Sequence, residues 1–171
     1  MPQPVIKPTV YLETTVISYL AAWPSRDIVR QAHQQITREW WENRRSSFDL
    51  LASELVVREA SAGDASAAQE RLRLLAGVRL LAVTNPAVEL AEHIVRRGAI
   101  PTNAAVDALH VAVAAANGVD YLLTWNCRHL ANAAMRHMID VACADRGFRP
   151  PVICTPESLS DEADDEGRNR G

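Results

Sequence analysis

Four polar side chains stand far apart in this sequence, at positions where a parallel α/β fold would bring them together: Glu13, Glu59, Asp107 and Asn126. Three of them are carboxylates, and the fourth carries an amide oxygen. Oxygen donors of this kind are the ligands that hard divalent cations prefer in proteins. The residue types therefore predict a metal site built by distant segments of the chain.

Short apolar runs precede three of these positions and are the elements that would place them. Residues 9–15 are rich in β-formers and reach an acid at Glu13, residues 48–53 lead into a helical stretch that carries Glu59, and residues 121–125 run directly into Asn126. In open parallel sheets, ligands bind beyond the carboxyl ends of the strands. We therefore expect Glu13, Glu59 and Asn126 at the same edge of one sheet.

Helical and strand patterns alternate along the rest of the chain, which predicts βα units and a parallel sheet. Ser25 is the expected N-cap of a long helix, with Ile28, Ala32, Ile36 and Trp40 on its apolar face. A later helix is expected to turn Val106, Leu109, Val113 and Ala116 toward the sheet. The further strands are expected at 78–83 and 152–154, and the helices at 16–22, 25–45, 54–60, 65–75, 85–97, 103–117 and 128–145.

The chain has 171 residues and is 48% hydrophobic, enough for one domain with its own core. No apolar run approaches the roughly 18 residues that span a bilayer, and the first residues lack a signal-peptide pattern, so we expect no membrane association and a cytoplasmic location. The three cysteines, Cys127, Cys143 and Cys154, form no CxxC pair. They predict small, buried or partly buried apolar side chains rather than disulfides or a zinc site.

The charges are unevenly distributed. The net charge is −3, but residues 160–171 hold five of the 21 acids and two of the 18 basic residues, which leaves residues 1–159 formally neutral. Sequestering several acids around cations would leave a mildly basic surface, compatible with RNA binding. We expect one folded domain over residues 1–159 and a disordered acidic tail over residues 160–171.

Four motifs in order resemble those of the PIN-domain family, most closely the VapC-type toxins of bacterial toxin-antitoxin pairs. They are residues 10–18 around Glu13, Ser53 with Glu59, residues 107–114 beginning at Asp107, and residues 122–126 ending at Asn126. The resemblance spans about residues 9–156. It implies a three-layer α/β/α sandwich with a central, mainly parallel five-stranded sheet, and a Mg²⁺- or Mn²⁺-dependent ribonuclease. It also implies a homodimer, an RNA substrate and a small antitoxin that enters the active-site groove.

Two positions depart from the family pattern, since the family usually has Asp where this chain has Glu13 and often has Asp where it has Asn126. Glutamate keeps the charge, whereas asparagine keeps only an oxygen acceptor. Divalent ions can activate water and stabilise the oxyanion in phosphodiester cleavage. In this interpretation Glu13 and Asp107 bind the ion, Glu59 holds the ion or its water, and Asn126 orients water. Thr14, Thr15 or Thr124 would orient these side chains.

Other roles remain open for several residues. His110 fits either a contact with the site or an ordinary helix histidine, and Arg128 and His129 fit either a phosphate contact or a solvated surface. Asp120 precedes its strand and is predicted to be structural. The chain lacks the DxDxT pattern of haloacid-dehalogenase phosphatases and any P-loop, GxGxxG or GxSxG motif. The alternative function is therefore a catalytically weak or inactive PIN-like protein that binds RNA or a protein partner through the same groove.

Overall fold

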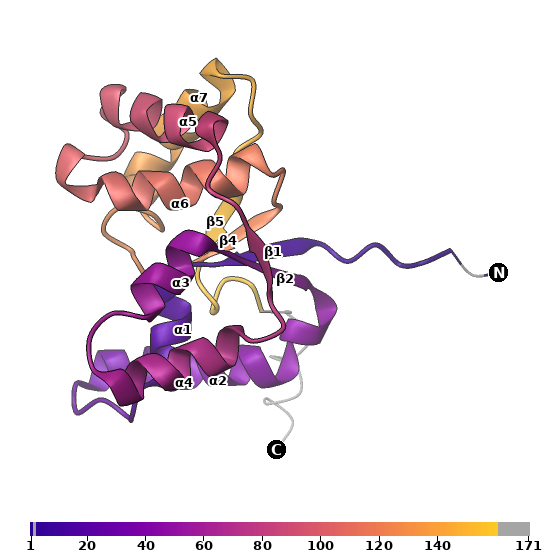
Figure 1. The fold of residues 1–171 in the computed structure, drawn as a ribbon, viewed down its shortest axis with the longest axis vertical. Coiled ribbons are helices and arrows are strands. Elements are labelled where there is room, and N and C mark those ends of the chain that lie inside the picture. The colour runs from indigo at the N-terminus through magenta and orange to yellow at the C-terminus, as the bar shows by residue number, and fades with distance from the viewer. Residues whose placement is uncertain (2, 161–171) are drawn as a thin grey trace, which may run out of the picture.

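Five parallel strands form the central sheet of the part of the chain that the structure describes, in the order β3-β2-β1-β4-β5 (Figure 1). The structure is a computed structural model, and it describes residue 1 and residues 3–160. The strands are β1 (Thr9–Leu12), β2 (Asp49–Ser53), β3 (Arg79–Leu81), β4 (Tyr121–Leu123) and β5 (Val152–Cys154). The chain proceeds outward from β1 in one direction and from β4 in the other, so the strand order reverses between them. Ligand sites of parallel α/β sheets lie beyond the strand ends at such a point.

Helices cover both faces of this sheet. Helices α1 to α4 pack together on one face, and α5, α6 and α7 pack together on the other (Figure 1). The helices are α1 (Thr14–Ala21), α2 (Ile28–Asn43), α3 (Glu54–Ala60), α4 (Ala65–Leu75), α5 (Asn85–Arg96), α6 (Ala105–Ala116) and α7 (Ala133–Asp145), with short 3-10 turns at Arg45–Ser47 and Thr102–Ala104. The expected three-layer α/β/α fold is confirmed, and every strand pair is parallel.

The core lies on both faces of the central strands. Val10, Tyr11 and Leu12 of β1 and Leu122 and Leu123 of β4 have no exposed surface. Strands covered on both faces lose the alternation of polar and apolar residues and become continuous apolar runs. The apolar runs that predicted β1 and β4 therefore also locate the middle of the sheet.

The long helix α2 begins and packs differently from our prediction. Its N-cap is Asp27, whose side chain accepts from Arg30 N at 2.8 Å, while Ser25 Oγ accepts from Asp27 N in the preceding turn. The predicted apolar face is also wrong at its start, because Ile28 is 80% exposed and Ala32 is exposed. The buried residues of α2 are Gln34, Thr37 and Trp40.

Two polar residues fit into this buried face because each finds a partner there. Gln34 accepts from Ser25 N and donates to Trp23 O. Thr37 donates to His33 O and accepts from the Trp125 indole at 2.7 Å. A hydrogen-bonded polar group can be buried without the large penalty of an unpaired one. A pattern search that counts only apolar residues therefore misidentifies this face.

Three further predictions, all for residues after 100, are wrong. Val106 of α6 is 48% exposed instead of facing the sheet, while Ala108, Val111 and Ala112 are fully buried. The helix expected from residue 128 begins at Ala133, because residues 126–132 form a turn. Cys127 lies in this turn and is exposed, contrary to the prediction, whereas Cys143 and Cys154 are buried as expected.

The predicted acidic tail lies, from residue 161 onward, outside the described residues. Among the helices of the described residues, none combines the length and the apolar character that crossing a membrane requires.

Candidate metal centre

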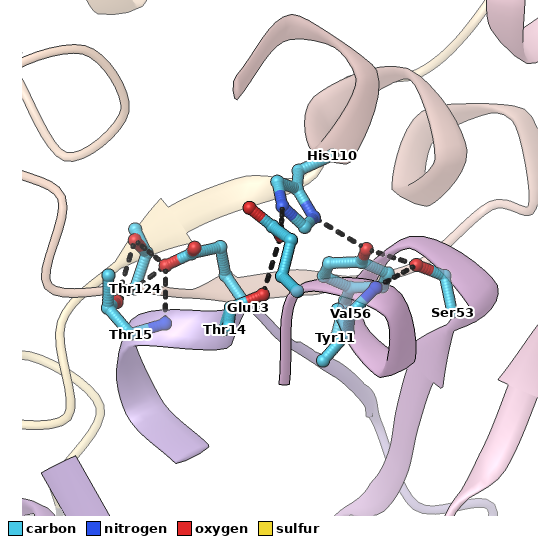
Figure 2. A network of polar contacts seen from close by, with 9 residues as sticks. Tyr11, Glu13, Thr14, Thr15, Ser53, Val56, His110 and Thr124 are labelled. Atoms are coloured by element: carbon cyan, nitrogen blue, oxygen red, sulfur yellow. Dashed lines mark hydrogen bonds and ion pairs between the residues drawn. The ribbon is translucent and has the colours of Figure 1, made fainter. Parts of the chain in front are cut away.

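Glu13 lies directly after β1 and is the N-cap of α1. Its Oε2 accepts from Thr15 N at 3.2 Å, from the Thr15 hydroxyl and from Thr124 Oγ1 at 2.7 Å (Figure 2). The side chain is only 4% exposed. Within the described residues, its other oxygen, Oε1, accepts no hydrogen bond. The helix start and the two threonines thus fix the carboxylate and leave one oxygen available to a ligand.

Glu59 lies in α3, the helix that follows β2. Its Oε1 accepts from Thr14 Oγ1 at 2.7 Å and contacts His110 Nε2 at 2.6 Å. Burial alone would raise the pKa of Glu59, but the hydrogen bond and charge of His110, together with the Thr14 hydroxyl, outweigh it and lower the pKa. Glu59 is therefore held in its ionised form, which is the form that binds a cation.

A buried chain of polar groups lies behind His110. His110 Nδ1 contacts Tyr11 OH at 2.8 Å, and Tyr11 OH contacts Ser53 Oγ at 2.7 Å (Figure 2). Ser53 is the N-cap of α3 and accepts from Val56 N. Burial is the main cause that raises the pKa of Tyr11, and the charges of Glu13 and Glu59 add to it against the hydrogen bond of Ser53, so the phenol stays neutral. The chain of contacts orients the imidazole toward Glu59.

Glu13, Glu59 and His110 form one compact cluster. Each offers a donor atom, and the three atoms lie within 4.8 Å of one another. Such spacing and a donor set of two carboxylates and one imidazole fit a divalent cation. Glu13 Oε1 accepts no hydrogen bond within the described residues, so this oxygen is available as a ligand atom. The residues present are thus able to hold the ion that the sequence predicts.

Asp107 and Asn126 belong to a second, adjoining group. Asp107 lies on α6 one turn before His110, and its Oδ2 is 3.0 Å from His129 Nδ1. Asn126 Oδ1 accepts from His129 N at 3.0 Å, and Asn126 N donates to Thr124 Oγ1, which in turn donates to Glu13. Asp107 is therefore outside the three-residue cluster, although Thr124 and α6 connect the two groups.

Sequence reasoning missed the residues that support the site from behind. It left His110 open, and it named Tyr11 and Ser53 only as parts of the family motifs, without a role beside His110. The spacing of three between Asp107 and His110 places both on one side of a helix, and this signal favours a site contact for His110. No comparable signal indicates the contact between Tyr11 and Ser53, because the register of β1 beside β2 brings their hydroxyls together.

Comparison with known proteins places this geometry in a family. The PIN domain model matches residues 10–149. A structure of VapC20 from Mycobacterium tuberculosis, described as a toxin that cleaves the sarcin-ricin loop, is 21% identical with a TM-score of 0.49 and covers 66% of this chain and 86% of that chain. A structure of VapBC2 from Rickettsia felis bound to a promoter DNA fragment is 15% identical with a TM-score of 0.54 and covers 86% of this chain and 98% of that chain. No curated protein matches. The order of the motifs, the parallel sheet and the match over most of the chain agree, and the protein belongs to the PIN-domain family.

Proposed function

We propose that this protein is a Mg²⁺- or Mn²⁺-dependent endoribonuclease and the toxin of a toxin-antitoxin pair. The observation that carries the proposal is the position of Glu13 and Glu59, two ligand-type carboxylates beside the carboxyl ends of β1 and β2, with their donor atoms within 4.8 Å. Family membership supports hydrolysis of RNA as the reaction. A toxin that acts on RNA would work in the cytoplasm.

The roles of the side chains follow from their contacts. Glu13 would bind the ion through Oε1, because Oε2 is held by Thr15 and Thr124. Glu59 would bind the ion or position a water molecule. The bound ion would supply the charge that activates water and stabilises the phosphorane oxygens. The threonines keep both carboxylates in place, so little reorganisation is needed when substrate binds.

Asp107 completes the proposed ligand set and Asn126 supports it. Asp107 would exchange its contact with His129 for the ion, since the pair is only partly buried, with each side chain 20% exposed. Asn126 would orient water or His129 through its side-chain oxygen. The exposed Arg128, which follows Asn126, is available to contact an RNA phosphate.

The proposed partners are an RNA substrate, a small antitoxin and a second copy of this chain. An acidic centre is most simply blocked by a cation, so we propose that the antitoxin places an Arg or Lys near Glu13, Glu59 and Asp107. The homodimer follows from the resemblance to VapC-type toxins.

A second candidate function has one observation in its favour. Asp107 is paired with His129, and Asn126 closes a turn, so both are satisfied without an ion. This arrangement is compatible with a PIN-like protein that binds RNA or a partner through the same groove and cleaves weakly or not at all. The experiment below separates the two functions.

The test compares the wild type with Glu13→Gln, Asp107→Asn and a control, Glu54→Gln, which removes an exposed acid from the same helix as Glu59. With Mn²⁺ or Mg²⁺ and a mixture of structured RNAs, the wild type and the control should cleave, and the two site variants should lose about 100-fold or more of the rate, because the ion loses a ligand. In growing cells, wild-type expression should arrest growth and Asp107→Asn should not. RNA binding without cleavage in all four proteins would favour the binding function, and harmless expression of an active nuclease would contradict the toxin assignment.

A further inference from the structure

The contact between His110 and Glu59 has two physical interpretations. It is either a permanent ion pair that fixes Glu59, or a pair of donor atoms that separate slightly when an ion enters. His110 is buried, with a side chain 1% exposed, and it points its Nε2 into the cluster that contains Glu13 and Glu59. The distance of 2.6 Å between His110 Nε2 and Glu59 Oε1 must be compared with the spacing of ligands around an ion.

Ligand geometry favours the second interpretation. Small octahedral divalent ions hold their ligands at about 2.1 Å, which places neighbouring donors roughly 3 Å apart. The pair would need to open by only a few tenths of an ångström to become two neighbouring ligands. Glu13 Oε1, on a side chain 4% exposed, has no hydrogen-bond partner within the described residues and would provide a third ligand.

The groups behind His110 suit a ligand imidazole. Histidines that bind metal nearly always direct their other ring nitrogen to a hydrogen-bond partner, which fixes the tautomer and the ring orientation. Here His110 Nδ1 meets Tyr11 OH at 2.8 Å, and Ser53 Oγ lies 2.7 Å from the same phenol. If Nε2 binds an ion, Nδ1 carries the proton and donates a hydrogen bond to Tyr11 OH. The phenol then donates a hydrogen bond to Ser53 Oγ.

We propose that His110 is a nitrogen ligand of the metal centre, held by Tyr11 and Ser53, and that this imidazole makes the site prefer Mn²⁺ over Mg²⁺. The inference rests on the proposed function, since it concerns the ion of the same site. Imidazole suits first-row transition metals, whereas Mg²⁺ takes oxygen ligands and keeps its water. A site of carboxylates alone would show a weaker preference between the two ions.

The decisive measurement is the electron spin-echo envelope modulation of Mn²⁺ bound to the wild-type protein, which detects a ¹⁴N nucleus bonded directly to the ion. We expect a nitrogen signal in the wild type, in His129→Gln and in the control His93→Gln. His93 lies on α5 and pairs with Asp145 of α7, away from the cluster. His110→Gln should lose the signal. Gln offers an amide nitrogen for Glu59 but no imidazole.

Affinity measurements give an independent readout. His110→Gln should weaken Mn²⁺ binding about 10-fold or more in calorimetry and Mg²⁺ binding about 3-fold or less. Tyr11→Phe, which keeps the ring and removes the hydroxyl, should weaken Mn²⁺ binding about 10-fold, as for other groups that orient a ligand histidine. Circular dichroism would confirm that both variants are folded.

The outcomes separate this inference from the proposed function. Bound Mn²⁺ without a nitrogen signal, combined with RNA cleavage that depends on Glu13, would overturn the role of His110 and leave the nuclease intact. A signal lost in His129→Gln instead of His110→Gln would assign the imidazole to the other histidine and also overturn the inference. Failure of both ions to bind at all would contradict the inference and the proposed function together.

Discussion

At the scale of single residues, the side chains of the site form hydrogen bonds with one another in the absence of an ion. Glu13 is fixed by Thr15 and Thr124, and Glu59 by Thr14 and His110. These contacts supply the positioning that the proposed catalytic role of the two carboxylates requires. They also explain how an acid such as Glu13 can be almost fully buried without losing its hydrogen bonds.

Asn126 allows a test at this scale. Its side chain accepts from His129 N, so Asn126→Ala should lower the free energy of unfolding by about 1 kcal/mol, as the loss of a capping acceptor usually does. Asn126→Asp keeps the acceptor and should change the stability by less than about 0.5 kcal/mol, while the added charge should tighten Mn²⁺ binding. Urea unfolding and calorimetry measure both effects. An equal loss of stability in both variants would rule out the capping role.

The sequence predicted that Glu13 and Glu59 would lie together, but it did not predict all of their neighbours. Acids placed after apolar runs could be recognised because the strand ends of a parallel sheet meet at one edge. The pairing of Asp107 with His129 could not be recognised, because it depends on a turn after β4 that sequence reasoning treated as helix. The chain from His110 to Tyr11 and Ser53 depends on strand register and on side chains that no local pattern links.

At the scale of secondary structure elements, strands were predicted more reliably than helix faces. β5, α3 and α4 have the expected bounds. The two helices begin where expected because the side chains of Ser53 and Asp64 cap their N-termini. The face of α2 was wrong because Gln34 and Thr37 are buried with partners that lie elsewhere in the chain. Periodicity describes which residues are apolar, and it does not describe which polar residues will find a partner.

The end of the sheet opposite the site is held by Asp120, as the sequence predicted. Its Oδ2 accepts from Thr9 N and Thr9 Oγ1, both at 2.9 Å, and its Oδ1 contacts Arg149. These contacts join the starts of β1 and β4. The Thr9 N–H is the largest cause that lowers the pKa of Asp120; burial opposes it, and the Thr9 hydroxyl and Arg149 lower the pKa further.

The lowered pKa predicts a particular dependence on pH. Because the carboxyl of Asp120 binds its proton less readily in the folded state, its contribution to stability is complete above its ordinary pKa of 3.8 and is lost as the pH falls through the lower folded value. Asp120→Asn should therefore reduce the melting temperature near pH 7 and narrow its difference from the wild type below about pH 3. Melting curves from pH 7 to pH 2.5 measure this, with Glu89→Gln, an exposed acid on α5, as control. A difference that stays constant with pH would contradict the linkage.

At the scale of the whole molecule, the fold converts separate segments into one site. The sheet places β1 between β2 and β4, and this arrangement brings Glu13 next to Glu59 and Thr124. Helix α6, from the opposite layer, adds Asp107 and His110 to the same edge. Each layer of the sandwich thus contributes to the centre. The sequence motifs indicated the order of the site residues along the chain. The strand order explains how residues so far apart in the sequence lie at one edge of the sheet.

The central claim is that this centre hydrolyses RNA with an ion-activated water molecule. The most direct measurement is the chemistry of the new RNA ends, made on an oligonucleotide cleaved by the wild type with Mn²⁺ and analysed by mass spectrometry. Attack by water leaves a linear phosphate and a free hydroxyl, and it tolerates a 2′-deoxy sugar at the cleaved bond. We predict these linear ends, no cleavage with EDTA, and cleavage slowed by about 100-fold or more in Asp107→Asn. A 2′,3′-cyclic phosphate, or cleavage that persists with EDTA, would contradict the account.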